Sequence, residues 1–378
     1  MFWRASLLGM LLVGALPALA YAHGTAPGVR QIFARSTDTV IATSRGLVFG
    51  DPARRRWSLL CGGALGIPDE TPYSLAVQPS GALLVASLEG LRRSDDDGCT
   101  WTPHPVFGDA DITDLAQDAA QPARLHLAIF GGAQAGIHTS DDGGTTFRRR
   151  YAAGPDEYIG SLRARGSTLV ATVATTEEVP RFFLLRSTDA GATWTRTALA
   201  LGDQVLDVGV LALHRDALLL RVFYFDQRTG DDLLRSSDGG GTFASAGRFV
   251  GLADAAFSAD GTSVFLATSE GLMRARTAEY AFARVGDAVS SSHVTVRGDE
   301  VLAGVAYPDG ELVLPGIAKL AGDPSTPVVR LMTFDSVTTL HACAPPSPVA
   351  CACEKAWLDW SIEFPKDAAS AAPVCAAP

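Results

Sequence analysis

The sequence predicts an all-β protein: a single seven-bladed β-propeller with a short C-terminal appendage rich in cysteine and proline. Three observations support this prediction. An eight-residue pattern recurs four times at a nearly constant spacing, four strand-like segments surround each copy, and weaker copies lie on both sides. The chain has 378 residues, of which 47% are apolar and 19% charged, so it can bury a large core.

The repeated octet reads Ser-x-Asp-x-Gly-x-Thr-aromatic, and its copies begin at Ser94, Ser140, Ser187 and Ser236. Their spacings of 46, 47 and 49 residues match the period of a four-stranded propeller blade. Asp and Ser side chains accept hydrogen bonds from the backbone of a tight turn, Gly supplies a positive φ, and the aromatic residue restarts a strand. The residues expected to build these turns are Asp96, Gly98, Trp101, Asp142, Gly144, Phe147, Asp189, Gly191, Trp194, Asp238, Gly240 and Phe243.

The octets indicate where the second to fifth blades lie in the sequence. In the second blade, strand-like segments separated by turn signals cover residues 73–77, 83–87, 90–94 and 100–106. The same arrangement predicts the next blades at 112–152, 158–199 and 205–249. Weaker copies predict the first, sixth and seventh blades at 29–61, 251–285 and 290–337. A six-bladed ring is the alternative if an end copy pairs differently.

The octet resembles the Asp box, or BNR repeat, of sialidases, sortilin-type receptors, xyloglucan-cleaving hydrolases and a photosystem assembly factor. This resemblance implies the propeller fold and says little about function, because in those families the motif lies on hairpins away from the active face. Sialidases also carry an early Arg-Ile-Pro segment, whereas residues 29–33 read Val-Arg-Gln-Ile-Phe. The xyloglucan hydrolases hold two carboxylates between tandem propellers, and this sequence predicts one propeller.

Because these catalytic features are missing, we expect an exported, non-catalytic binding or assembly scaffold that engages a protein or glycan through one propeller face. A sialidase-like or xyloglucanase-like glycoside hydrolase is the alternative. The sequence contains no His-Glu-x-x-His, phosphate-loop or Gly-x-Ser-x-Gly motif. We predict no catalytic residue, metal site or cofactor.

The N-terminal segment predicts a cleavable export signal over residues 1–22. Arg4 precedes an apolar stretch at 7–19, and small residues lie at the expected cleavage point before His23. The most apolar later stretch, 205–225, is interrupted by charged residues, so we predict no membrane span in the mature chain. The expected location is secreted, periplasmic or at the cell surface.

The predicted organisation is a signal peptide at 1–22, a propeller at 23–337 and a cysteine-rich tail at 338–378. Six cysteines in an exported chain predict disulfides rather than metal ligands. We expect Cys61 and Cys99 to pair across the first two blades. The pairing of the remaining four is left open, and these are Cys343, Cys351, Cys353 and Cys375.

Acidic residues recur in the linkers that join the outer strand of one blade to the inner strand of the next. These linkers share one face of a propeller, opposite the octets, where they would attract a basic protein segment or a cation. The alternative is that solvated loops favour Asp. The formal net charge of -10 argues against nucleic-acid binding. The candidate ligand-binding residues are Asp69, Glu70, Asp109, Asp111, Asp156, Glu157, Tyr158, Asp203, Asp254 and Asp287.

Overall fold

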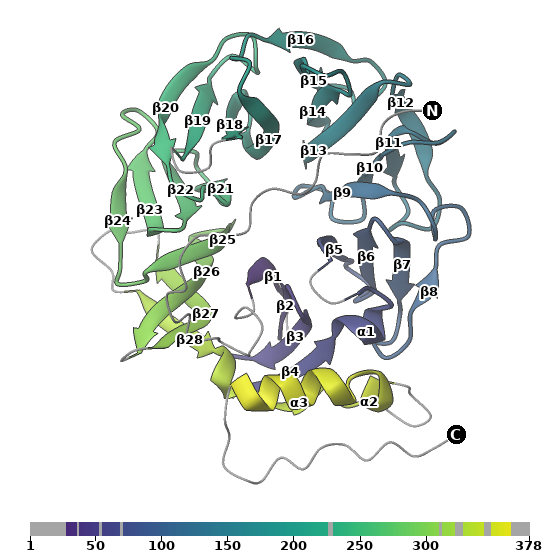
Figure 1. Ribbon diagram of the computed structural model, residues 1–378, viewed down its shortest axis with the longest axis vertical. Helices are drawn as coiled ribbons and strands as arrows, with labels where there is room; N and C mark the ends of the chain where they lie inside the picture. The colour runs from purple at the N-terminus through teal and green to yellow at the C-terminus, as the bar shows by residue number, and fades with distance from the viewer. Residues whose placement is uncertain are drawn as a thin grey trace, which may run out of the picture.

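A computed structural model of the chain describes residues 28–35, 38–52, 55–68, 71–225, 230–309, 312–321, 328–343 and 349–363. Seven β-sheets surround a central axis (Figure 1), so the seven-bladed prediction is confirmed and the six-bladed alternative is wrong. The predicted signal peptide, Asp69, Glu70 and Cys375 lie outside the described residues.

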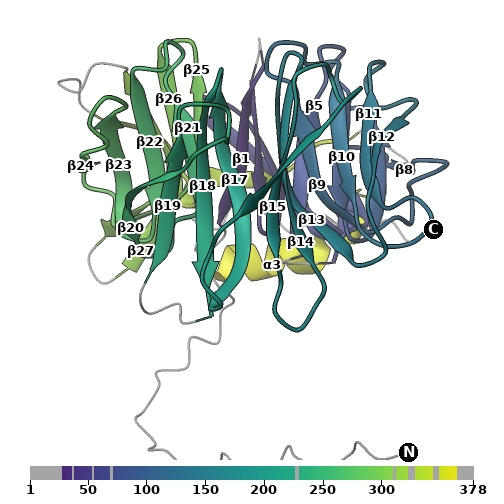
Figure 2. The ribbon, with the colours of Figure 1, turned by 90° about the horizontal axis from the view of Figure 1, so that it is seen from above.

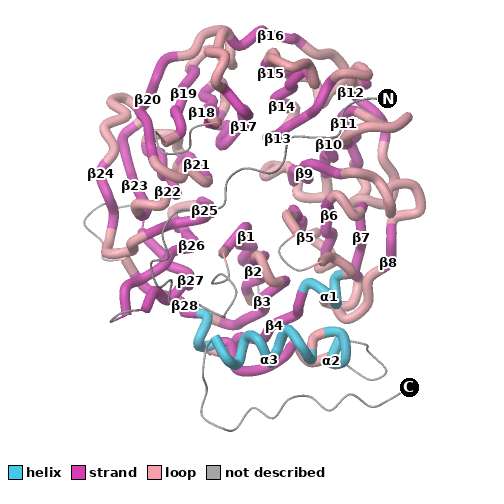
Figure 3. Tube along the Cα trace, viewed as in Figure 1, coloured by secondary structure: helices cyan, strands magenta, loops and turns pink. Residues whose placement is uncertain are grey.

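Each blade is an antiparallel meander of four strands that runs from the axis outward (Figure 3). The innermost strands are β1 (Val29–Ala34), β5 (Tyr73–Val77), β9 (Ile112–Gln117), β13 (Glu157–Arg165), β17 (Val205–His214), β21 (Asp254–Phe257) and β25 (Ser290–Arg297). The second strands are β2 (Thr39–Thr43), β6 (Leu83–Ser87), β10 (Leu125–Ile129), β14 (Thr168–Thr175), β18 (Ala217–Tyr224), β22 (Ser263–Thr268) and β26 (Glu300–Asp309).

The third strands are β3 (Gly46–Asp51), β7 (Gly90–Ser94), β11 (Gly136–Ser140), β15 (Phe182–Ser187), β19 (Asp231–Ser236), β23 (Gly271–Arg276) and β27 (Leu312–Ala321). The outer strands are β4 (Arg56–Cys61), β8 (Thr102–Pro103), β12 (Arg148–Ala152), β16 (Thr195–Leu199), β20 (Ala244–Phe249), β24 (Ala283–Val285) and β28 (Val329–Thr333). A short helix, α1 (Gly62–Leu65), joins the first two blades.

Burial explains the sequence pattern of the strands. The second strands β6 and β10 are buried along their whole length, because each blade packs between two neighbours and both of its faces contact protein. They are accordingly mostly apolar, with the sequences LLVAS and LHLAI. The outer strand β12 is largely exposed and carries three consecutive arginines. The apolar clusters therefore lie mainly between neighbouring blades.

Each octet forms a tight turn between the third and outer strands of its blade. In the fourth blade, the carboxylate of Asp189 accepts hydrogen bonds from the amide and the hydroxyl of Thr193, at 2.8 and 2.6 Å. The hydroxyl of Ser187 accepts a hydrogen bond from the Gly191 amide at 2.8 Å. The side chains thus satisfy backbone and hydroxyl donors that the turn would otherwise leave to solvent.

The octet also fixes the distance between blades. Gly144 has a φ of +85°, and a β-carbon there would lie 2.3 Å from Cδ2 of Leu84 in the preceding blade. Gly240 has a φ of +93°, and a β-carbon there would lie 2.1 Å from Cδ2 of Leu184. Glycine is needed at both positions for the backbone angle and for the close approach.

Acid should weaken the fold through the octet carboxylates. Burial raises the pKa of Asp142, but hydrogen bonds from Thr146, Ser140 and Thr145 lower it to about 2. The hydroxyl and amide of Thr193 lower the pKa of Asp189 to about 2. The folded pKa lies below the unfolded value, so this stabilisation is complete above about pH 4 and is lost as pH falls towards about 2. We expect the melting temperature to fall across that window.

The matched measurement is a melting temperature series between about pH 5 and pH 2 for the wild type, Asp142→Asn and Asp299→Asn. Asp142→Asn should reduce the fall of the melting temperature with decreasing pH. Asp299 lies in an exposed turn, so its substitution should leave this fall unchanged. Equal slopes in all three proteins would contradict the assignment of the acid sensitivity to the octets.

The chain after the seventh blade crosses back over the first. A 3-10 turn, η2 (Phe334–Ser336), leads into β29 (Val337–Leu340), which adds to β4 as a parallel fifth strand. Helices α2 (Val349–Ala352) and α3 (Glu354–Glu363) then lie along the outer edge of that blade (Figure 1). Trp357 and Trp360 are buried in a cluster that also contains Trp57 of the first blade and Met332 of the seventh. The tail therefore packs over the seam of the ring.

The predicted Cys61–Cys99 bridge is wrong. Cys61 is bonded to Cys353 and Cys99 to Cys343, with Cα–Cα distances of 5.4 and 5.5 Å. Both bridges tie the first two blades to the tail. Cys351 is also disulfide-bonded, and its partner lies outside the described residues. The sequence could not indicate these pairings, because it is the closed ring that brings the tail beside the first two blades.

Candidate functional site

Strand connections alternate between the two faces of the ring, and Figure 2 shows the strands running between these faces. Linkers between blades and loops from second to third strands lie on one face, which we call the linker face. The octets and the loops from first to second strands lie on the other, which we call the octet face. The candidate acids predicted from sequence belong to the linker face or to the adjoining ends of the inner strands.

Four of the exposed candidate acids have no side-chain hydrogen bond or ion pair within the described part of the chain. These residues are Asp109, Asp111, Asp156 and Asp203. The octet face differs. Four of its carboxylates each lie 2.6 Å from an arginine nitrogen, in the pairs Asp95–Arg93, Asp97–Arg35, Asp141–Arg124 and Asp216–Arg186. These four carboxylates therefore leave negative charge on the linker face without a compensating cation among the described residues.

Three other candidate acids already have partners within the fold. Glu157 accepts hydrogen bonds from the Gly154 amide at 2.8 Å and the Tyr151 hydroxyl at 3.1 Å, and it pairs with Arg196. Burial raises the pKa of Glu157, but these partners lower it overall. Asp287 pairs with Arg330 at 2.9 Å. Asp254 faces the central channel.

Tyr158 lies beside an exposed aromatic side chain on the linker face. Its ring meets Phe130 edge to face at 5.6 Å, and burial raises the pKa of its hydroxyl. Two further tyrosines near this face, Tyr73 and Tyr307, are only 8% and 1% exposed. The Tyr73 hydroxyl donates to the Gly46 carbonyl at 2.8 Å, so this side chain packs within the fold.

Sequence reasoning missed the apolar side chains of the linker face. Ten large apolar side chains are exposed among the described residues, and eight of them lie at this end of the blades. These eight are Leu88, Val106, Phe130, Val179, Leu206, Phe225, Val250 and Val289. Most stand at strand ends or in loops, so hydrophobic periodicity gave no signal. Strand connections alternate between the two faces. Assigning every loop to a face on this basis is the only way in which the sequence could have shown that these side chains share one face.

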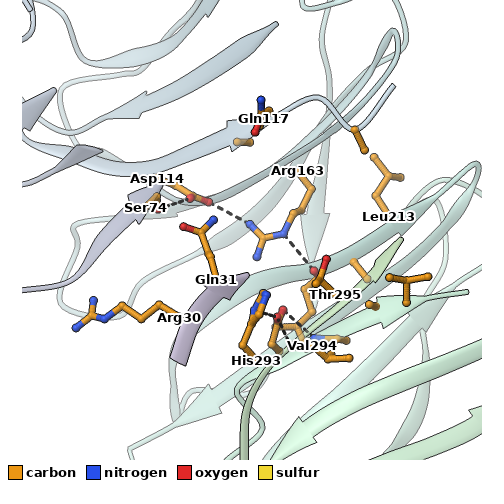
Figure 4. A pocket seen from close by; sticks show the side chains of 18 of the residues that line it. Arg30, Gln31, Ser74, Asp114, Gln117, Arg163, Leu213, His293, Val294 and Thr295 are labelled. Carbon is orange, nitrogen blue, oxygen red and sulfur yellow. Dashed lines mark hydrogen bonds and ion pairs between the residues drawn. The ribbon is translucent and has the colours of Figure 1, made fainter. Parts of the chain in front are cut away.

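The central channel contains a cavity of about 460 Å³ lined by inner strands (Figure 4). The carboxylate of Asp114 accepts hydrogen bonds from the Leu162 amide at 2.9 Å and from Arg163 at 3.2 Å. Asp254 lies 2.6 Å from Nδ1 of His293 and accepts a hydrogen bond from the Val294 amide at 3.2 Å. Both carboxylates are therefore occupied in linking neighbouring blades.

One group of potential metal ligands occurs among the described residues. Ligand atoms of Cys99, His341 and Cys343 lie within 4.8 Å of one another. The two sulfur atoms share a disulfide, so neither offers the thiolate that a metal ion requires. The oxidised protein therefore has no thiolate ligand at this position.

No known family model and no curated protein matches the sequence. Solved structures do match the fold. An ancestral GH74 enzyme matches with a TM-score of 0.58 and 13% identity, over 82% of this chain and 47% of that chain. A puromycin-hydrolyzing peptidase of Mycobacterium tuberculosis matches with a TM-score of 0.53 and 12% identity, over 84% and 55%. The Dos1 propeller matches with a TM-score of 0.51 and 12% identity, over 86% and 89%.

At such low identity, the likeness shows the β-propeller fold alone. The chain spans about half the length of the first two of these proteins. In the part of the chain that the structure describes, no helix is both long and apolar enough to span a bilayer.

Proposed function

We propose that the protein is a non-catalytic binding or assembly scaffold that engages a protein or glycan through its linker face. The observation that carries this proposal is the gathering of eight exposed apolar side chains on that face. Exposed apolar side chains that lie mostly at one end of the blades favour that end as an interaction surface. The unpaired carboxylates of the same face add a charge preference.

The proposed setting is outside the cytoplasm. Two disulfides tie the tail to the first two blades, and such bridges are typical of exported proteins. This supports the proposal that residues 1–22 are a signal peptide and that the mature chain is secreted, periplasmic or at the cell surface. The hydrogen bonds of the octet turns support the proposal that the chain is an Asp-box propeller.

A glycoside hydrolase is the second candidate, and one observation favours it. Burial raises the pKa values of Asp207 and Asp231, and both carboxylates feel the charge of Arg221. A carboxyl group with a raised pKa is what a general acid requires. Against this role, the channel carboxylates Asp114 and Asp254 are already occupied by amides and by Arg163 and His293.

The test is a screen of residues 23–378 against glycan and peptide arrays and chromogenic glycosides, with retained binding and turnover read separately. Leu206→Ser with Val250→Ser should weaken retained binding at least about tenfold, because both side chains belong to the linker face. Val329→Ser with Leu358→Ser is the matched control, since these side chains lie elsewhere and are at least as exposed.

We expect the control pair to leave binding unchanged, and both pairs to keep the wild-type melting temperature. Equal losses of binding in the two pairs would contradict the linker-face assignment. If the protein hydrolyses a glycoside and Asp207→Asn abolishes this activity, the hydrolase proposal would replace the scaffold proposal.

A further inference from the structure

We propose that a pocket between the second and third blades is an anchor site for a lysine or arginine side chain of a protein partner. This inference rests on the proposed function, because it names the partner and one of its contacts on the linker face. The pocket has a volume of about 520 Å³. The linker from Pro103 to Asp111 and the loop from Ile129 to Gln134 line it.

The charge of the pocket suits a cation. Asp109 and Asp111 line it, both are exposed, and within the described chain neither side chain has a hydrogen bond or ion pair. No lysine or arginine is among the lining residues. Arg149 reaches the lining only at the Ala133 carbonyl, to which it donates at 2.9 Å. Two carboxylates in one pocket, neither of them in an ion pair, attract a basic side chain.

The histidine of the pocket does not supply a compensating charge. Nδ1 of His104 accepts hydrogen bonds from the Val106 and Phe107 amides, both at 3.2 Å, which requires that nitrogen to be unprotonated. Burial lowers the pKa of His104, although Asp142 and the Thr145 carbonyl act in the opposite direction. The ring is therefore neutral at physiological pH, and the pocket keeps its negative charge.

The apolar part of the pocket suits the stem of such a side chain. Val106 is 61% exposed and Phe130 is 39% exposed, and both line the pocket. The methylene groups of lysine or arginine pack against apolar surface while the charged end reaches a carboxylate. The face of Phe130 adds a cation–π attraction when the charge lies above it. One pocket thus offers both kinds of contact that these two side chains make.

The composition of the surrounding face favours a protein over a glycan. Six of the eight exposed apolar side chains on the linker face are leucine or valine. Sugar rings stack on flat aromatic side chains, whereas branched aliphatic side chains pack against those of another protein. Of the tyrosines near this face, Tyr73 and Tyr307 are buried, and Tyr158 is half-buried against Phe130. The partner that fits is a protein segment carrying basic and aliphatic side chains together.

The test uses fluorescein-labelled octapeptides and fluorescence polarisation at about 0.15 M salt, where long-range attraction is screened. The probes alternate Lys with Leu, Glu with Leu, or Lys with Ser. We expect the Lys–Leu peptide to bind, the Glu–Leu peptide not to bind, and the Lys–Ser peptide to bind at least tenfold more weakly. Asp109→Asn with Asp111→Asn should lower the affinity for the Lys–Leu peptide about tenfold or more.

The control changes the same charge on the octet face, through Glu279→Gln with Asp299→Asn, two exposed side chains. It should leave the affinity unchanged. Equal losses in the two variants would show attraction by net charge and overturn the anchor site. Peptides that bind through Leu206 and Val250 without a basic preference would also overturn it, and the proposed function would stand. If the array screen finds glycan binding and no peptide binds, the protein partner is overturned. If no peptide, glycan or glycoside binds, both proposals are overturned.

Discussion

Removing both bridges to the tail should destabilise the protein by more than the two single-bridge losses combined. Cys61–Cys353 spans 292 residues and Cys99–Cys343 spans 244. While both are intact, each one closes a loop of only about 50 residues, because the other already joins the tail to the ring. Removing either should therefore cost about 2 to 4 kcal/mol, the ordinary range for one bridge.

When both bridges are removed, the unfolded chain also loses the constraint that closes the long loop of 244 to 292 residues. Loop-closure entropy then adds about 1.5 kcal/mol beyond the sum of the single losses. Urea unfolding of Cys61→Ala with Cys353→Ala, of Cys99→Ala with Cys343→Ala, and of the fourfold variant gives the three free energies of unfolding. The truncation of each side chain is shared by the single and combined variants, so it cancels. A fourfold loss equal to the sum, or smaller, would show that the bridges do not close a shared loop.

A methyl group on an octet glycine should have the next largest effect. Gly240→Ala places a β-carbon 2.1 Å from Cδ2 of Leu184 and forces alanine into a φ of +93°. Backbone strain and overpacking together should lower the free energy of unfolding by about 2 to 4 kcal/mol. The contact crosses from one blade to the previous one, so the substitution should separate blades four and five.

The matched control lies one residue further along the chain. Gly241→Ala meets its nearest atom, Oδ2 of Asp238, at 3.2 Å, and the third octet already has Ala192 at the equivalent position. We expect it to change the free energy of unfolding by less than about 0.5 kcal/mol. Urea unfolding of both variants measures the difference. Similar losses for Gly240→Ala and Gly241→Ala would show that the octet does not set the spacing between blades.

The sequence predicted the blades closely where the pattern was local. The segments expected at 73–77, 83–87 and 90–94 are β5, β6 and β7 with the same bounds. The outer strand expected at 100–106 shrinks to Thr102–Pro103. Pro103 and Pro105 have no amide hydrogen to donate to the sheet, and the chain turns towards the pocket at this point. Edge strands are the least constrained part of each blade, so their ends were the least predictable.

The candidate site was predicted in part. The linker positions of Asp109, Asp111, Asp156 and Asp203 followed from the repeat, and these side chains are exposed in the structure. The repeat could not show that Glu157 and Asp254 are occupied by Arg196 and His293, because those partners come from the outer strand of the same blade and from a neighbouring blade. A single sequence carries no record of which distant side chains meet.

By itself, the sequence determined the four-stranded repeat of the blades, the turns of the octets and the acidity of the linkers. Each of these depends on residues only a few positions apart, where side-chain periodicity and turn chemistry act directly. The tertiary structure alone decided the disulfide pairing, the passage of the tail over the seam, and the gathering of apolar side chains on one face. Those features join residues up to 292 positions apart. At that separation, local sequence patterns do not constrain which residues come into contact. Closure of the ring brings them together, because seven repeated blades can bury their faces only by packing against one another.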